Sequence, residues 1–303
     1  MITAEGLTKR FGDKTAVQDV SFTVKPGTVT GFLGPNGAGK STTMRLIVGL
    51  DRPTSGTATV AGQEYRKLRA PLTEVGVLLD AKAVHTGRTA RNHLRAMAAT
   101  HGIPASRVDE VIELAGIGSV ARKRAGKFSL GMGQRLGIAS ALLGDPHTLI
   151  LDEPVNGLDP EGVRWVRQFV RHAASEGRTV LLSSHLMSEM AQTADHVIVM
   201  GRGQVLADAP LDELVRAWTR NTVRVRTPRA ADLAAAVGGP DVEIVSTAPD
   251  LLDVVGLPAS RIGDLAADRG IPLHELTPTT GSLEDAYLAL TGDAVEYRTK
   301  EIS

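Results

Sequence analysis

The chain has 303 residues, 42% hydrophobic and 22% charged, which is long enough for one large domain and a smaller one. Its net charge is zero, which excludes a global electrostatic field that attracts nucleic acid. It has no cysteine, which excludes disulfides and thiolate metal sites. No run approaches the ~18 apolar residues of a membrane span and the first residues lack a signal-peptide pattern, so we expect neither feature.

The N-terminal 34 residues favour strands. Residues 16–24 carry strand-forming side chains and stop at a Pro-Gly turn pair. Residues 29–33 form a short apolar stretch that suits a buried strand, and residues 57–62 suggest a strand with a turn. Between these two stretches a helix is predicted, because apolar residues recur at helical spacing: Met44, Leu46, Ile47 and Leu50.

The segment between the buried strand and this helix fits the phosphate-binding pattern G-x-x-x-x-G-K-[ST]. Its glycines allow backbone N–H groups to curl around phosphate oxygens, and the helix presents its positive end to the same anion. Lys40 is expected to reach the β- and γ-phosphates, and the Ser41 hydroxyl to bind Mg²⁺. A glycine-rich turn with a surface lysine is the alternative, which the strand and helix context disfavours. The predicted nucleotide-binding residues are Gly34, Asn36, Gly37, Ala38, Gly39, Lys40, Ser41 and Thr42.

The middle of the chain changes to helical spacing and then returns to strands. Residues from about 80 to 145 read as a helical insert. Strand patterns resume at residues 148–152, 179–184 and 196–200, with helices between them. Near-continuous apolar strands that alternate with helices predict an α/β fold, with a parallel sheet covered on both faces.

Two acidic residues, Asp152 and Glu153, end one of these apolar strands. The carboxyl end of a buried parallel strand lies where ligands of such sheets collect, beside the phosphate loop. Asp152 is expected to hold Mg²⁺ directly or through water, and Glu153 to accept a proton from, or orient, the water that attacks the γ-phosphate. A solvated acidic turn is the alternative, and the fit to the phosphate loop disfavours it.

The pattern changes again after residue 220, which suggests a nucleotide-binding domain over residues 1–220 and a small α+β accessory domain over residues 221–303. The second segment reads in the order βαββαβ, the ferredoxin-like arrangement, followed by a helix over residues 282–290. It contains no catalytic constellation. Its expected elements cover residues 223–227, 230–237, 242–245, 251–255, 259–268 and 271–276.

Residues 128–135, with the sequence Phe-Ser-Leu-Gly-Met-Gly-Gln-Arg, precede a long helix with an apolar face. Together with the two motifs above, this segment resembles the signature sequence, usually written LSGGQ, of ATP-binding-cassette (ABC) ATPases. Ser129 and Gly131 match that pattern, whereas Phe128, Leu130 and Met132 depart from it. The resemblance covers residues 1–220 and implies a P-loop NTPase fold of the ABC type, with ATP and Mg²⁺ as cofactors.

Three further residues stand in register with the family's motifs. The resemblance implies that Phe11 stacks on adenine, that Asp159 lies in the loop crossing a dimer interface, and that His185 touches the γ-phosphate. Alone, each has a plainer explanation: a core aromatic residue, a helix start with Pro160 at its first position, and a structural histidine. Their joint register favours the functional roles.

One position departs from the family. The family commonly has a glutamine at the end of a Gly-x-x-x-Gln strand, and in residues 76–80 that place holds Asp80. An aspartate could bind Mg²⁺ or its waters through oxygen. It could equally be an ordinary loop residue, and both interpretations stay open.

The resemblance also implies partners. Two ABC domains face each other head to tail, and each ATP lies between the phosphate loop of one and the signature of the other. We expect a homodimer rather than a heterodimer, docked on a separate transmembrane permease at the cytoplasmic face of the membrane, with no nucleic acid. The signature variant and residues 279–292 resemble ATPase subunits of bacterial drug and antibiotic exporters. The alternatives are a soluble ABC ATPase that acts on ribosomes or DNA, and a non-hydrolysing regulatory cassette; the intact Lys40, Asp152, Glu153 and His185 disfavour the latter.

Overall fold

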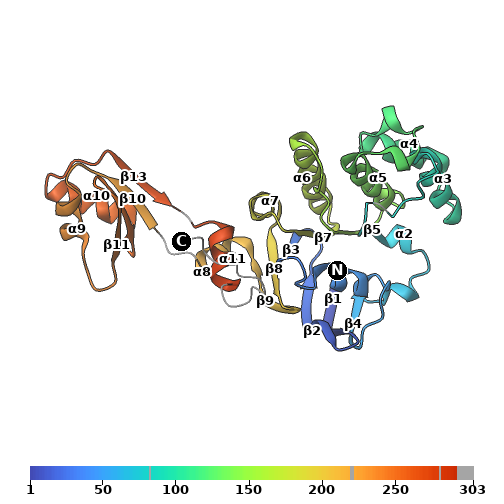
Figure 1. Ribbon diagram of the computed structural model, residues 1–303, viewed down its shortest axis with the longest axis horizontal. Helices are drawn as coiled ribbons and strands as arrows, with labels where there is room; N and C mark the ends of the chain where they lie inside the picture. Colours follow the sequence, from blue (N-terminus) through green and yellow to red (C-terminus); the bar gives the residue numbers. More distant parts are fainter. Residues whose placement is uncertain (82, 219–221, 280, 292–303) are drawn as a thin grey trace. The chain divides into compact units, whose positions relative to one another are not determined.

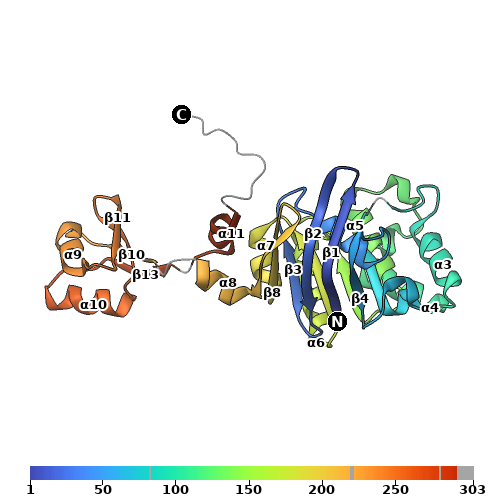
Figure 2. The same ribbon diagram turned by 90° about the horizontal axis from the view of Figure 1, so that it is seen from below.

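The computed structural model describes residues 1–81, 83–218, 222–279 and 281–291 (Figures 1 and 2). The described residues form two compact units, divided after Leu211. Among the described helices, none combines the length and the hydropathy that a membrane span requires.

A six-stranded sheet forms the centre of the first unit. Its strand order is β5-β6-β7-β3-β8-β9, with parallel pairing from β5 to β8 and an antiparallel edge strand, β9. Every residue of β3, β6 and β7 is buried, as a sheet covered on both faces requires. The strands are β3 (Val29–Leu33), β5 (Val75–Leu78), β6 (Thr148–Leu151), β7 (Thr179–Ser184), β8 (His196–Gly201) and β9 (Gln204–Pro210). The predicted parallel sheet is therefore confirmed.

Different layers cover the two faces of this sheet. Helices α6 (Pro160–Ser175) and α7 (Met187–Thr193) lie on one side, and an antiparallel sheet of order β2-β1-β4 lies on the other (Figure 1). Apolar side chains of α1 (Lys40–Ile47) join the two sheets into one core. The small sheet consists of β1 (Ile2–Phe11), β2 (Lys14–Val24) and β4 (Ser55–Val60).

The helical insert lies between β5 and β6 in the sequence, as predicted. Its helices are α3 (Ala90–Thr100), α4 (Ala105–Leu114) and α5 (Leu130–Leu142). The insert also contains the 3₁₀ turns Gly118–Val120 and Ala125–Lys127. The 3₁₀ turn Tyr65–Lys67 and the short helix α2 (Pro71–Glu74) precede β5.

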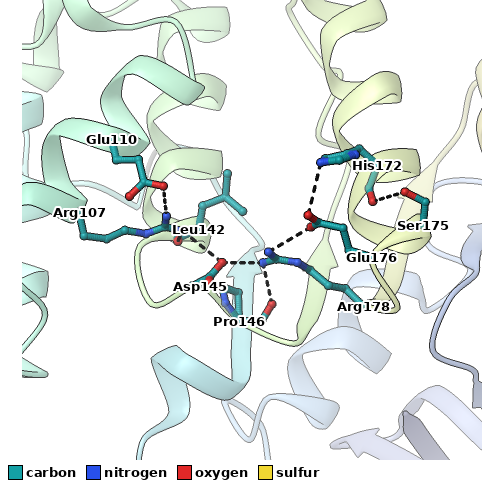
Figure 3. Close-up of polar contacts among 9 residues, drawn as sticks. All are labelled: Arg107, Glu110, Leu142, Asp145, Pro146, His172, Ser175, Glu176 and Arg178. Carbon is teal, nitrogen blue, oxygen red and sulfur yellow. Dashed lines mark hydrogen bonds and ion pairs between the residues drawn. The ribbon is translucent and has the colours of Figure 1, made fainter.

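An ion-pair network around Asp145 ties the insert to the central sheet (Figure 3). The Asp145 carboxylate accepts from Arg107 of α4 at 3.3 Å and from Arg178, just before β7, at 2.9 Å. Arg178 also pairs with Glu176 at 3.2 Å, and Arg107 donates to the carbonyl of Leu142 at 2.9 Å. The network therefore joins α4, the end of α5 and the entry to β7.

The second unit has the predicted order βαββαβ. Its antiparallel sheet has the order β11-β12-β10-β13, and buried apolar residues of α9 and α10 pack on it. The last strand begins at Glu275 rather than at the expected Ile271, and the His274 N–H just before it donates to the Arg226 carbonyl. The elements are α8 (Leu211–Trp218), β10 (Thr222–Arg226), α9 (Ala230–Val237), β11 (Glu243–Ala248), β12 (Leu251–Val255), α10 (Ala259–Asp268), β13 (Glu275–Thr279) and α11 (Leu283–Thr291).

Close packing of α5 on the sheet depends on Gly76 of β5. A Cβ atom there would lie 2.2 Å from the carbonyl oxygen of Ala141 and 2.9 Å from Cδ2 of Leu149. Because a backbone oxygen cannot rotate away, we expect Gly76→Ala to lower the free energy of unfolding by about 1–3 kcal/mol. Differential scanning calorimetry should show a lower melting temperature for the first unit.

Gly263→Ala, in α10, is the matched control. Its added Cβ would meet Cδ2 of Leu276 at an ordinary 3.4 Å, and alanine favours a helix over glycine by about 0.5–1 kcal/mol. We expect no loss of stability from this change. An unchanged melting temperature in Gly76→Ala would contradict the packing argument.

Candidate active site

The phosphate loop connects β3 to α1 and depends on left-handed backbone. Gly37 has φ 84° and Gly39 has φ 104°, values that favour glycine. A Cβ at Gly39 would also lie 2.8 Å from the Ala16 carbonyl oxygen of β2. The loop therefore needs glycine at position 39 for conformation and for space.

A cavity of about 700 Å³ opens over this loop. It brings together the predicted residues Phe11, Glu153 and those from Asn36 to Thr42. Lys14, Arg202 and Gly203 also line it, and sequence reasoning did not find them. Arg202 and Gly203 lie in the turn between β8 and β9. The Gly203 N–H donates to the Ala38 carbonyl of the phosphate loop at 3.0 Å. That contact depends on the order of strands in the sheet, which no local motif reveals.

Lys40 opens α1, and its side chain is buried. Its ammonium donates to the carbonyl of Gly34 at 2.6 Å and to that of Pro35 at 3.3 Å. Burial lowers the pKa of Lys40, and the negative charges of Glu153 and Asp152 partly oppose that shift. The two acids therefore lie close enough to Lys40 to stabilise its charge.

The acid pair follows β6, as predicted, and β7 supports it. Ser183 donates to Oδ1 of Asp152 at 2.5 Å and accepts from the Glu153 N–H at 2.9 Å. His185 Nδ1 lies 2.8 Å from Oε2 of Glu153. The structure thus brings together Lys40, Asp152, Glu153 and His185. Sequence reasoning missed Ser183, although a small polar residue at the end of a neighbouring parallel strand was the available signal.

Phe11 ends β1 at the rim of the cavity. Its side chain is 51% exposed, which is unusual for a phenylalanine, and Lys9 Nζ lies 4.8 Å from the ring centroid. An exposed ring at a cavity rim suits stacking on a planar ligand.

The signature residues and Asp159 lie away from this cavity, at the starts of α5 and α6. Ser129 caps α5 by accepting from the Met132 N–H at 3.3 Å, and Asp159 caps α6 by accepting from the Gly162 N–H at 2.8 Å. A Cβ at Gly131 would lie 2.7 Å from the Gly157 carbonyl oxygen, so these two helix starts approach closely. Within one chain, Asp159 therefore has the plain capping role, and none of these residues lines the phosphate-loop cavity.

Asp80 follows β5 at the carboxyl edge of the sheet. Its carbonyl accepts from the Ala83 N–H at 3.1 Å. Among the described residues, no group of three or more His, Cys, Asp or Glu side chains is placed to hold a metal ion by itself.

Comparison with known proteins decides the family. A family model described as ABC transporter matches residues 17–156. A bacitracin transport ATP-binding protein from Bacillus licheniformis is 42% identical over 71% of this chain and 71% of its own length. The chain belongs to the ABC transporter family. The predicted family, fold and ATPase class are thereby confirmed.

Other relatives cover more of the chain of this ABC ATPase. A daunorubicin resistance ATP-binding protein from Streptomyces coeruleorubidus is 33% identical over 99% of this chain and 98% of its own. A solved structure described as the ATP binding subunit of an ABC transporter superposes with a TM-score of 0.66, at 25% identity, over 72% of this chain and 92% of that one. A second family model, described as a domain of unknown function (DUF8746), matches residues 221–284.

We expect Lys40→Met to remove the charge that faces the phosphates. ATPase activity should fall by about 100-fold or more, the size seen when a group that stabilises phosphoryl-transfer charge is lost. Lys67→Met is the matched control, because Lys67 is 69% exposed and pairs with Glu64 outside the cavity. Phosphate release by the two purified variants tests this. Comparable activity in Lys40→Met and Lys67→Met would contradict the assignment.

Proposed function

We propose that this ABC ATPase powers export of an antibiotic or another small lipophilic drug through a separate membrane permease, from the cytoplasmic face of the membrane. The match to a daunorubicin resistance protein over 99% of this chain carries the proposal, because it spans both units. The bacitracin transport relative supports the same class of cargo. The ATP-binding domain comprises residues 1–220 in this proposal, and residues 221–303 form the accessory domain.

The contacts in the cavity support the proposed residue roles. Phe11 stacks on adenine, Lys40 neutralises the β- and γ-phosphates, and His185 contacts the γ-phosphate. Glu153 accepts the proton of the attacking water, because it lines the phosphate-loop cavity and its carboxylate contacts the His185 ring.

Mg²⁺ fits the oxygen donors present here. Nucleotide-bound Mg²⁺ takes one or two protein oxygens and completes its octahedron with phosphates and water, so no cluster of three acids is needed. We propose Ser41 and Asp152 as these donors, with Asp80 as a further outer contact. When bound, the ion neutralises charge that develops on the phosphates.

A second copy of the chain completes the site in this proposal. Ser129, Gly131 and Asp159 lie outside the chain's own cavity, at the positive ends of two adjacent helices. A head-to-tail homodimer places these helix ends against the ATP of the other copy. ATP then holds the dimer together, and hydrolysis releases it.

Glu153→Gln should therefore bind ATP, lose turnover and accumulate as a dimer. The amide has nearly the same size but cannot accept the proton of the attacking water. Gel filtration with light scattering, with and without ATP and Mg²⁺, measures the mass. Glu176→Gln is the control, because Glu176 directly follows the end of α6 and belongs to the Asp145 network. If Glu153→Gln remains monomeric with saturating ATP, the sandwich is wrong.

The transport role predicts a membrane partner. The tagged chain, purified from detergent-solubilised membranes of its own cells, should retain a polytopic membrane protein identifiable by mass spectrometry. Membranes from cells with the untagged chain are the control. Co-purification with ribosomes and no membrane protein would contradict the export proposal.

A further inference from the structure

The backbone of Glu153 is strained, and its conformation aims the proposed base. Glu153 has φ 49°, in the left-handed region that is unfavourable for a residue with a Cβ. Asparagine and aspartate tolerate this region better than glutamate. Because the direction of the carboxylate follows from this backbone, surrounding groups must hold it in place.

Two side chains from different elements bind the peptide groups of Glu153. Ser183 of β7 accepts from its N–H at 2.9 Å, and Gln134 of α5 donates through Nε2 to its carbonyl at 2.8 Å. The Asn156 N–H donates to the same carbonyl at 3.2 Å. Ser183 belongs to the central sheet, whereas Gln134 belongs to the helical insert.

Gln134 makes this bond at a cost in stability. Its side chain is 5% exposed, and its Oε1 has no partner among the described residues. A buried acceptor without a partner destabilises the fold, a penalty that an apolar side chain of similar size avoids. The carbonyl of Glu153 would still receive the Asn156 N–H if Gln134 were removed. Stability alone therefore does not account for a glutamine at this place.

We propose that Gln134 is a positioning residue that holds the base Glu153 for ATP hydrolysis and links it to the signature helix. Ser129 caps the same helix α5, only five positions before Gln134. When α5 contacts the nucleotide bound to a second copy, a shift of this helix therefore moves the Glu153 carbonyl through the hydrogen bond from Gln134. This inference rests on the proposed role of Glu153 and adds a route by which the dimer controls it.

Gln134→Leu tests the inference. We expect kcat to fall about tenfold or more, as when a catalytic group is displaced by a fraction of an ångström. The Kd for a fluorescent ATP analogue should stay within about twofold, and the melting temperature should not fall. Gln168→Leu, at an exposed position of α6, is the matched control and should leave all three quantities unchanged.

Gln134→Glu adds a readout that a purely structural role would not produce. The carboxylate cannot donate to the Glu153 carbonyl, whereas its protonated form can. The activity of this variant relative to the unaltered chain should therefore rise as the pH falls from about 8 to 6, because burial raises the pKa of a carboxyl group.

Three outcomes would overturn the inference. The first is full kcat in Gln134→Leu. The second is a loss of ATP affinity and melting temperature together with activity in Gln134→Leu, which would indicate a structural role. The third is a flat ratio of activities across pH in Gln134→Glu. An unaltered chain that binds ATP without hydrolysing it would instead overturn the role of Glu153 itself, and so distinguishes failure of the proposed function from failure of this inference.

Discussion

Enclosure of the Lys40 ammonium is the constraint on which the rest of the nucleotide-binding unit depends. A buried cation must be compensated by carbonyl oxygens and carboxylates, or its pKa falls until it is neutral. The carbonyls of Gly34 and Pro35 supply the first kind of partner, and the acids after β6 supply the second. Loss of the two carboxylates would leave only the carbonyl oxygens to compensate the charge.

The register of the parallel strands delivers those acids. Leu33 of β3 pairs with Ser184 of β7, and Leu151 of β6 pairs with Leu182. Phosphate loop, Ser183 and acid pair therefore leave the sheet at the same edge. Because β7 separates β3 from β6, it also supplies the hydroxyl that bridges Asp152 and the Glu153 N–H. A slip of register in β7 would move that hydroxyl to the other face.

Sequence could predict what is local and could not predict what depends on strand order. Local patterns gave the phosphate loop, the acid pair and helices α9 and α10, because each is set by glycine conformation, strand termination or helical spacing. Ser183 and Gln134 lie 30 and 19 positions from Glu153, and their contacts follow from the sheet order and from the packing of α5. The antiparallel pairing of edge strand β9 also depends on tertiary structure and not on a local pattern.

Three unfavourable features of the first unit meet at the proposed catalytic site, whereas others, among them the buried Nε atoms of Arg91, Arg107 and Arg167 that lack a partner among the described residues, lie elsewhere in it. Glu153 has strained backbone, Lys40 is a buried cation, and Gln134 carries an unpartnered acceptor. In residues 222–279 and 281–291, by contrast, no buried side-chain nitrogen or oxygen lacks a partner. The arginines of β10 there pair with acids on adjacent chain segments, Arg224 with Asp253 at 3.0 Å and Arg226 with Asp250 at 2.9 Å.

Strain of this kind persists only where surrounding structure over-determines it, and it gathers at functional sites. The proposed base Glu153, the buried Lys40 and Gln134 of α5 are therefore held in place by their surroundings although each one destabilises the first unit. Gln134 connects the helical insert to this strained residue, because its side chain on α5 donates to the carbonyl of Glu153.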